Sequence, residues 1–285
     1  MTERVNIMSY VILCDSCTDF TPEMERDSHF IRIPLTLRVG DVEIIDDETF
    51  DQADFLRRVA AEPECPKSSC PSPEKYMEYF GNADDVYVVT LSSRLSGSYN
   101  SAELAKKMYL ETHPEKNIFV FDSKSASAGQ TLQAQEIRKR AEKGMPFKQL
   151  ISEVTNYIDT MGTKFVLETL EMLRKNGRLS SVTAAIISAL NVKLVMSSDG
   201  QGAIEKVTQA RGMKKAIMKM VSAIAADAVD AKNRILCISH CNNEKRAEFV
   251  KNAVAELQLF KDIIVTKTGG VSSLYAADGG IVVAY

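Results

Sequence analysis

The fold of this chain is decided by the stretch Val86-Tyr-Val-Val-Thr-Leu-Ser-Ser-Arg-Leu-Ser-Gly-Ser-Tyr-Asn-Ser-Ala102. Residues 86–91 are β-branched, aromatic or aliphatic for the most part, which is typical of a strand covered on both faces. A turn rich in serine follows, and Ala102 begins a helical pattern that continues through Leu104 and Met108. This order of strand, turn and helix predicts an open α/β sheet.

The serine-rich turn is also the first candidate binding site. In an open α/β sheet, ligands bind beyond the carboxyl ends of the strands, at the first amides of the next helix. The hydroxyls of residues 92–101 and the backbone N–H groups beside them can hold a small anion there. An ordinary serine N-cap explains the same residues equally well, so both interpretations stay open at this point.

Length and composition exclude several classes of protein. The chain has 285 residues, 45% of them hydrophobic, and its 35 basic side chains are balanced by 38 acidic ones. It has no dense basic run and no apolar stretch long enough to span a bilayer, so neither a nucleic-acid partner nor stable membrane insertion is expected. Residues 1–8 lack the apolar segment of a signal peptide, which predicts a cytoplasmic protein.

Two of the six cysteines have a spacing that needs an explanation. Cys14 and Cys17 form the C-x-x-C pattern of thiol-redox and zinc sites, directly after a predicted strand. A zinc site needs two more ligands, and the other cysteines are scattered, so no metal site is predicted. Small residues that close a tight turn are the simpler interpretation. A thiol-redox protein using Cys14 and Cys17 is kept as an alternative.

The whole chain is predicted to form two α/β halves. Buried strands at residues 10–14, 86–91 and 118–121 each lead through a turn rich in Asp and Ser into a helix. After residue 161, Asp199-Gly200 predicts a hairpin, and more strands and helices follow. We expect an α/β fold of two packed domains, residues 7–161 with a parallel sheet in three layers and residues 162–285 with a mixed sheet.

Three segments between these elements carry further expectations. Residues 40–51 are acidic and are expected to form a loop. The proline-rich segment of about residues 62–75 is expected to be extended and able to pack with the second domain. Residues 131–142 are expected to form an amphipathic helix.

Several motifs occur in an order that is found in one family. They are Asp15-Ser-Cys-Thr-Asp19, Ser68-Ser-Cys-Pro-Ser72, Leu91-Ser-Ser-Arg-Leu-Ser-Gly-Ser-Tyr99, Asp122-Ser-Lys-Ser-Ala-Ser127, Leu173-Arg-Lys-Asn-Gly-Arg-Leu-Ser180 and Arg211-Gly-Met-Lys-Lys-Ala216. In this ordered set the chain resembles the DegV family, the bacterial fatty-acid-binding proteins that include the FakB subunits of fatty acid kinase. Each motif is weak alone, whereas the set covers roughly the whole chain and is specific.

The resemblance implies a ligand rather than a cofactor. A long-chain fatty acid such as palmitate, stearate or oleate would lie in a tunnel between the two domains, and no other cofactor is expected. Ser68 and Ser93 match the family positions whose hydroxyls bind the carboxylate, and Ser96 and Gly97 are secondary candidates. Neutral hydroxyl and amide donors can satisfy a carboxylate that is taken out of water.

The chain departs from the family pattern at three positions near the expected carboxylate site. Ser68 replaces a threonine, which keeps the hydroxyl, and Cys70 replaces a glutamine. Tyr275 stands where many members of the family have a histidine near the acid. A tyrosine hydroxyl can still donate a hydrogen bond to the carboxylate.

The alkyl tail of the fatty acid would contact a different set of residues, which line the tunnel. Phe165, Leu167, Ile187, Leu190 and Leu194 are expected to line the tunnel, although any domain core needs residues of this kind. Each buried methylene of an acyl chain contributes about 0.8 kcal/mol, so burial of the tail would dominate the affinity.

The resemblance also implies a possible docking surface. In FakB proteins a basic segment docks on a kinase that converts the bound acid into acyl-phosphate. Arg211, Lys214 and Lys215 match that segment, while exposed basic residues are also common where no partner binds.

A serine-dependent hydrolase of acyl esters is the alternative from another functional class. Ser93 or Ser96 would be the nucleophile, and His240 with Asp15 or Asp122 would have to supply the base and the acid that orients it. The sequence contains no Gly-x-Ser-x-Gly, Walker or dinucleotide-binding motif. A lipid-binding carrier without chemistry of its own is therefore the favoured function.

Overall fold

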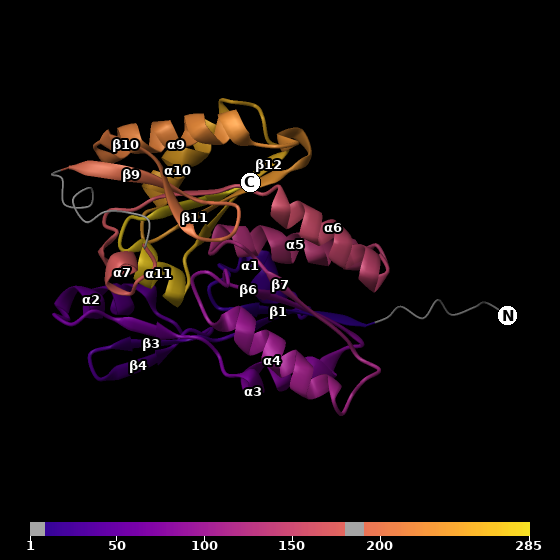
Figure 1. Ribbon diagram of the computed structural model, residues 1–285. Helices are drawn as coiled ribbons and strands as arrows, with labels where there is room; N and C mark the ends of the chain where they lie inside the picture. Colours follow the sequence, from indigo (N-terminus) through magenta and orange to yellow (C-terminus); the bar gives the residue numbers. More distant parts are fainter. Residues whose placement is uncertain (1–8, 180–190) are drawn as a thin grey trace.

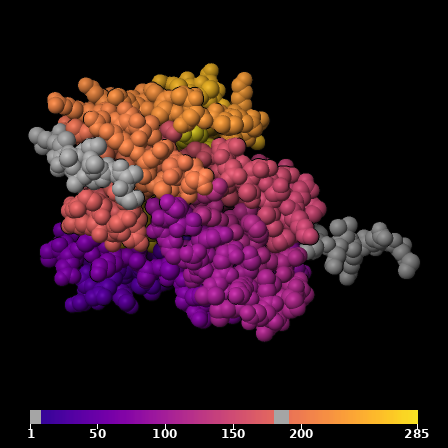
Figure 2. All heavy atoms as spheres, in the orientation of Figure 1, coloured from indigo at the N-terminus to yellow at the C-terminus, as the bar shows by residue number. Residues whose placement is uncertain are grey.

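The computed structural model describes residues 9–179 and 191–285, which form two lobes. Figure 1 shows the N-terminal lobe in indigo to magenta and the C-terminal lobe in orange to yellow, with α5 and α6 at the level between them. In the space-filling view of Figure 2, the second lobe rests directly on the first.

The N-terminal lobe is built on a parallel sheet, as predicted. Its strands are β1 (Tyr10–Asp15), β2 (Phe30–Ile33), β6 (Asp85–Thr90) and β7 (Asn117–Asp122), in the order β2-β1-β6-β7. All three pairings are parallel. Every residue of β6 is buried, as expected for a strand with cover on both faces. The predicted turns after β1, β6 and β7 therefore share one rim of the sheet.

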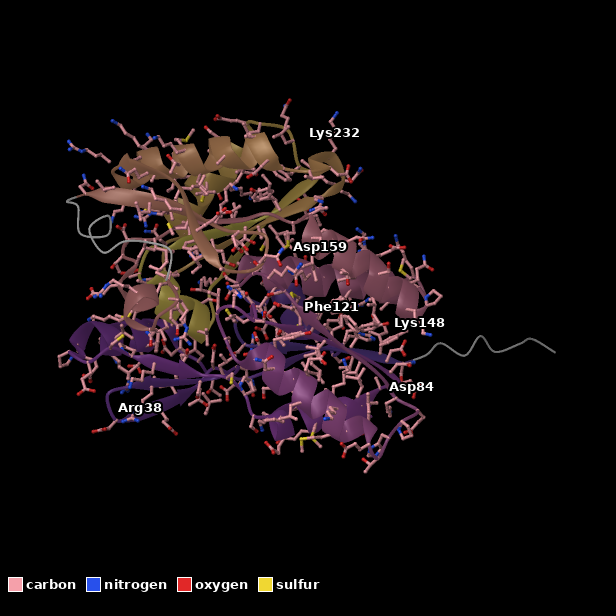
Figure 3. All side chains as sticks on the ribbon, viewed as in Figure 1. Arg38, Asp84, Phe121, Lys148, Asp159 and Lys232 are labelled. Carbon is pink, nitrogen blue, oxygen red and sulfur yellow. The ribbon has the colours of Figure 1, made fainter. Side chains whose placement is uncertain are left out.

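Helices cover both faces of this sheet and complete the three layers. One face packs against α3 (Pro73–Met77), the 3-10 turn η1 (Phe80–Asn82) and α4 (Ser98–Leu110). The other packs against α1 (Pro22–Arg26), α5 (Ala128–Glu142) and α6 (Phe147–Asp159). Phe121 points into this second core, and Lys148 lies on the outer surface (Figure 3).

The C-terminal lobe has the expected mixed sheet. Its order is β10-β9-β8-β13-β11-β12, and only β11 and β12 are parallel. The predicted hairpin is confirmed, because β9 and β10 pair antiparallel across Asp199-Gly200. The strands are β8 (Thr163–Val166), β9 (Val192–Ser198), β10 (Ile204–Arg211), β11 (Ile235–His240), β12 (Asp262–Lys267) and β13 (Ile281–Ala284).

Helices again complete the lobe. On one face of the sheet, α9 (Met213–Asp227) and α10 (Glu244–Ala255) bury an aliphatic core. The described part of the lobe also contains α7 (Glu171–Lys175), the 3-10 turn η2 (Ala231–Asn233) and α11 (Gly270–Ala276). The sequence analysis did not foresee α11, whose Gly-Gly start and Ser-rich body resemble a loop.

One helix serves both lobes, which corrects the expectation for residues 131–142. Ala134 and Ile137 of α5 pack on the first sheet, whereas Ala128 and Leu132 pack against Cys237 of the second. Residues 128–134 are all buried, so this half of α5 is not amphipathic. A helix between two sheets has no solvent-facing stripe.

The expectation of a loop at residues 40–51 was wrong in part. Residues 42–45 form β4 (Val42–Ile45), which pairs with β3 (Thr36–Val39), and β3 pairs in turn with β5 (Lys67–Ser69). This small antiparallel sheet places Ser68 opposite Leu37. The helix α2 (Gln52–Ala61) follows it.

The segment at residues 62–75 does contact the second half of the chain. Asn176 donates a hydrogen bond to the carbonyl of Pro66 (3.2 Å), and Ser68 is bonded to Tyr275 (2.9 Å). The domain boundary at residue 161 stays a prediction.

Gly162, which directly precedes β8, gives a first test of the packing of the C-terminal lobe. The Cβ of an alanine at Gly162 would lie 2.4–2.7 Å from the nearest ring carbons and the hydroxyl oxygen of Tyr285, which is buried. We expect Gly162→Ala to lower the free energy of unfolding by about 1–3 kcal/mol, measured by urea denaturation. Gly81→Ala is the control, because its Cβ would meet only the Tyr109 hydroxyl at 3.3 Å. Equal stability of the two variants would contradict this packing.

Candidate functional site

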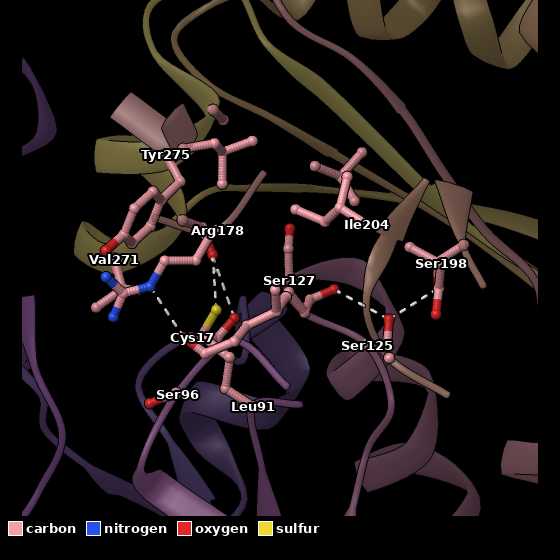
Figure 4. Close-up of a pocket in the computed structure, with 18 of the residues that line it drawn as sticks. Cys17, Leu91, Ser96, Ser125, Ser127, Arg178, Ser198, Ile204, Val271 and Tyr275 are labelled. Atoms are coloured by element: carbon pink, nitrogen blue, oxygen red, sulfur yellow. Dashed lines mark hydrogen bonds between the residues drawn. The ribbon is translucent and has the colours of Figure 1, made fainter. Parts of the chain in front are cut away.

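A cavity of about 330 Å³ lies between the lobes, on the rim where β1, β6 and β7 end (Figure 4). This volume lies at the lower end of the range for small-molecule sites. Its described walls come from both lobes and are largely aliphatic. They include Cys17, Leu35, Leu91, Leu95, Ala126, Phe165, Leu167, Leu173, Ile204, Val271, Ala276 and Val282.

One end of the cavity is polar and reaches the surface. Ser68 and Tyr275 line it, with their hydroxyl oxygens 2.9 Å apart. Cys70 and Gly97 also line it and are exposed, and a Cβ at Gly97 would lie 3.1 Å from the Cys70 sulfur. Ser68, Cys70, Gly97 and Tyr275 therefore form the mouth of the cavity.

Arg178, to which the sequence analysis assigned no role, places a positive charge at this mouth. Arg178 lines the cavity beside Tyr275 and is half-buried (Figure 4). Its Nε donates to the carbonyl of Leu95 (3.1 Å) and its Nη1 to that of Asn176. These bonds hold the guanidinium over the serine-rich turn, where it favours a bound anion. The only sequence signal for it was its place in the motif at residues 173–180.

The serine-rich turn brings Ser96 to the cavity but not Ser93. Ser96 and Gly97 belong to the wall, and Ser96 Oγ accepts a hydrogen bond from the Ser98 amide (3.2 Å). Ser93 lies outside the described lining, and its Oγ donates to Asp122 at the end of β7 (2.5 Å). The structure thus gives the Ser93 hydroxyl a different partner from the one expected, and a carboxylate-binding role for it stays a prediction.

A buried carboxylate holds this turn in place. Asp15, at the end of β1, accepts hydrogen bonds from the Leu91 amide (2.6 Å) and from the Gln130 side chain (2.8 Å). Burial raises the pKa of Asp15 to about 6, although these hydrogen bonds act to lower the pKa. The first strand therefore positions the turn between β6 and α4 through a single side chain.

The opposite end of the cavity is buried and its hydroxyls are already bonded. Ser125 and Thr163 share a hydrogen bond of 2.7 Å, and Ser197 Oγ donates to the carbonyl of Thr163 (3.0 Å). Figure 4 shows Ser125 and Ser198 on the side away from Tyr275 and Arg178. Ser198 Oγ donates to the Lys124 carbonyl (3.0 Å). Because these hydroxyl protons have protein acceptors, this end can accept an alkyl group without losing hydrogen bonds.

The predicted tunnel residues have mixed outcomes. Phe165 and Leu167 line the cavity. Leu194 lies outside the described lining and packs in the same hydrophobic cluster as those two residues. Ile187 and Leu190 lie outside the described residues.

The predicted docking residues are far less enclosed. Arg211 ends β10, and Lys214 and Lys215 lie in the first turn of α9. All three are exposed, and the Lys214 ammonium lies 5.5 Å from the centre of the Phe249 ring. Such a surface is accessible to a partner.

The thiol-redox alternative finds no support in this geometry. Cys14 and Cys17 are free and fully buried, and burial is the main cause that raises the pKa of both thiols. A reactive thiol needs a lowered pKa. Within residues 9–179 and 191–285, no group of three or more His, Cys, Asp or Glu side chains could hold a metal ion.

The hydrolase alternative lacks a histidine base near its serines. Ser93 is bonded to Asp122 and Ser96 to Ser98. His240 is buried at the end of β11, where its Nδ1 accepts a hydrogen bond from the Asn243 amide (3.2 Å). None of the histidines lines the cavity in the described part of the chain.

As for membrane insertion, no helix among the described ones is long and apolar enough to cross a bilayer.

A family model described as "Uncharacterised protein, DegV family" matches residues 9–285. The chain belongs to the DegV family. A DegV domain-containing protein of Streptococcus gordonii is 36% identical over 280 residues, which cover 98% of this chain and 99% of that protein. One of Streptococcus pneumoniae is 33% identical over the same length.

Three solved DegV structures that contain fatty acids match nearly the whole chain. A Ruminococcus gnavus protein with vaccenic acid has a TM-score of 0.95 and 46% identity, over 98% of this chain and 100% of that one. The fatty acid kinase B3 protein of Streptococcus pneumoniae, loaded with linoleic acid, has a TM-score of 0.91 and 32% identity, over 98% and 99%. A Eubacterium eligens DegV protein with heptadecanoic acid has a TM-score of 0.89 and 28% identity, over 97% and 99%.

The raised pKa of Asp15 gives a prediction with a defined sign. The folded protein keeps this proton up to about pH 6, above the ordinary range of an aspartate, so the group's stabilising contribution is present at low pH and is lost as the pH rises through about 6. An asparagine carries no such penalty. We therefore expect the melting temperature of Asp15→Asn, relative to the natural protein, to rise between about pH 5 and about pH 8, by the equivalent of about 1–3 kcal/mol.

The matched control for that comparison is Asp41→Asn, because the Asp41 side chain is fully exposed. This exposed variant gives the baseline against which the change for Asp15→Asn is measured. A relative melting temperature of Asp15→Asn that falls as the pH rises would show that the Asp15 carboxylate is stabilised, rather than penalised, by its surroundings.

Proposed function

We propose that this DegV protein binds one long-chain fatty acid in the cavity between its lobes. The carboxylate lies at the mouth, near Ser68, Tyr275, Ser96 and the amide of Gly97, and the alkyl tail extends towards Thr163 and Ser197. The observation that carries the proposal is a mainly aliphatic cavity with a polar, cationic mouth at one end.

The tail half of the proposal rests on burial of methylenes. Leu91, Leu95, Phe165, Leu167 and Ile204 offer the tail carbon surfaces from both lobes. At about 0.8 kcal/mol for each buried methylene, this contact supplies most of the binding free energy. The ligands of the three related structures, which are vaccenic, linoleic and heptadecanoic acid, have long alkyl tails.

The head half rests on the hydrogen-bond donors at the mouth. The hydroxyls of Ser68 and Tyr275 are bonded to each other, and either can turn one proton towards a carboxylate oxygen. Arg178 adds a positive charge at the same end, which favours the ionised acid. Tyr275 thereby supplies a donor at the position where the family resemblance implies a histidine.

The first measurement is native mass spectrometry of the purified protein. We expect an added mass that corresponds to one acid such as palmitate, stearate or oleate. Protein that carries no such mass and takes up no added oleate would rule out the proposed function.

Two serine variants test where the carboxylate lies. Ser68→Ala removes a donor at the mouth, so we expect the dissociation constant for oleate to rise by the equivalent of about 1–3 kcal/mol, measured by titration calorimetry. Ser93→Ala should have a smaller effect, because the Ser93 hydroxyl donates to Asp122. A larger loss for Ser93→Ala than for Ser68→Ala would restore the role that the sequence analysis gave to Ser93.

We further infer that the loaded protein presents its acid to a fatty acid kinase partner, which forms the acyl-phosphate. The related Streptococcus pneumoniae protein is named as a component of fatty acid kinase. The exposed basic residues Arg211, Lys214 and Lys215 give this chain a surface for an acidic partner.

Charge reversal tests this docking surface. With ATP and the kinase subunit of a fatty acid kinase, we expect the double variant Lys214→Glu, Lys215→Glu to form acyl-phosphate on the order of tenfold more slowly at unchanged content of bound acid. Lys148→Glu, on the outer surface of the other lobe (Figure 3), is the control. Equal rates for both variants would exclude docking at α9.

A further inference from the structure

The start of α11 is held by carboxylates of the other lobe. The amide of Gly269 donates to Asp19 (2.8 Å), and the amides of Gly270 and Val271 donate to the two oxygens of Asp46 (2.7 and 2.8 Å). The first amides of a helix have no carbonyl to bind within the helix. Here the N-terminal lobe supplies those acceptors, across the junction with the C-terminal lobe.

The contact between Asp46 and Gly270 is close, and Ser16 holds the Asp46 side chain in place. An ideal Cβ at Gly270 would lie 2.6 Å from Asp46 Oδ1, so only a glycine allows the helix to come this close. Ser16 donates to Asp46 Oδ2 (2.8 Å), and Ser16 Oγ in turn accepts from the Leu35 amide (3.0 Å). Asp46 is 2% exposed, so its charge is met by protein donors.

α11 forms one wall of the cavity, and its residue Tyr275 lies at the mouth. Val271, Ser272, Tyr275 and Ala276, all in this helix, line the cavity, and α11 lies between the lobes in Figure 1. A second tether comes from Gln52 of α2, whose side chain donates to Thr268 and Ser273. That tether is an uncharged amide, whereas the one through Asp46 depends on an ionised group.

A smaller hollow of about 250 Å³ reaches Asp46 from outside the fatty-acid cavity. It gives solvent and protons a route to the carboxyl that does not pass the ligand. The charged groups around Asp46 come from the loop after β1, from α1, β2, the loop after β4 and β12; α11 itself contributes none before Tyr275. These groups are Asp19, Glu25, Arg32, Asp47, Glu48 and Lys267.

We propose that Asp46 is a positioning residue for the fatty-acid site: its carboxylate holds α11 against the N-terminal lobe and keeps the acid enclosed, and its protonation speeds release of the acid. This inference rests on the proposed function. A proton on Asp46 removes the negative charge that strengthens its hydrogen bonds with the amides of Gly270 and Val271, so these two bonds weaken. The release rate is thereby linked to the state of one side chain.

Asp46 takes up its proton within a pH range in which the protein can be studied. Burial raises the pKa of Asp46 to about 6, while the amides of Val271 and Gly270, the Ser16 hydroxyl and Arg32 act to lower the pKa. The carboxyl is thus ionised at neutral pH and takes up its proton as the pH falls through about 6. Enclosure of the acid is complete above that pH and weakens below it.

The experiment is displacement of cis-parinarate, a fluorescent polyene fatty acid, by excess oleate in a stopped-flow instrument, using the full chain. At about pH 8 we expect Asp46→Asn to release the probe on the order of tenfold faster than the natural protein. At about pH 5 the ratio of the two rates should approach one, because the natural protein is then protonated too. The ligand carboxyl and Asp15 titrate in both proteins, so they cancel in this ratio.

Asp47→Asn is the matched control. Asp47 is the next residue and its side chain binds Thr49 rather than α11, so the ratio of the Asp47→Asn rate to the natural rate should be one both at about pH 5 and at about pH 8. A ratio of one for Asp46→Asn at every pH would overturn the proposal. A raised ratio that is equal at both ends of the pH range would also overturn it, because it would show a structural defect independent of protonation.

Hydrogen exchange of the natural protein keeps the proposal testable if Asp46→Asn does not fold. Exchange of residues 270–276, normalised to α10, should speed up as the pH falls through about 6, and an unchanged ratio would contradict the proposal. If cis-parinarate does not bind at all, the proposed function fails, whereas hydrogen exchange still reports on Asp46. If it binds and the rate ratio stays at one, only this inference fails.

Discussion

The structure depends on one constraint, which is that backbone N–H groups buried where the two lobes meet must find acceptors away from water. Carboxylates of the N-terminal lobe supply several of them. Asp15 accepts a hydrogen bond from the Leu91 amide, and Asp19 accepts one from the Gly269 amide. Asp46 accepts hydrogen bonds from the amides of Gly270 and Val271. The same bonds set the serine-rich turn and α11 at a defined distance on two sides of the cavity.

Keeping ionisable groups in such places has a cost, because burial disfavours the charged form of a carboxyl. The pKa of Asp15 and of Asp46 is raised to about 6 for this reason. A neutral acceptor such as the Gln52 side chain also bridges the lobes, so charge is not the only solution that the fold uses. In our proposal the Asp46 carboxylate makes this junction sensitive to pH, whereas the Gln52 amide does not titrate.

The cavity arises because neither sheet can close it alone. The first sheet presents the rims of β1, β6 and β7, the second presents β8 and the hairpin of β9 and β10, and α5 packs on both. Because both lobes line this cavity mainly with carbon, the fatty acid that we propose suits it better than a polar ligand would. At the mouth, Ser68 comes from a small third sheet that the acidic composition of residues 40–51 had concealed.

The sequence by itself determined the elements that local pattern controls, because strand burial and turn chemistry depend on neighbouring residues. These include the buried strand before the serine-rich turn, the parallel and mixed sheets, the hairpin at Asp199-Gly200, and Phe165 and Leu167 as cavity wall. Only the tertiary structure decided which hydroxyl faces the cavity. Ser93 and Ser96 lie three positions apart in one turn, yet Asp122 on the next strand takes the hydroxyl of Ser93 and leaves Ser96 at the wall. The same holds for α11, whose first amides find their acceptors more than two hundred residues earlier in the chain, a separation that no local pattern reports.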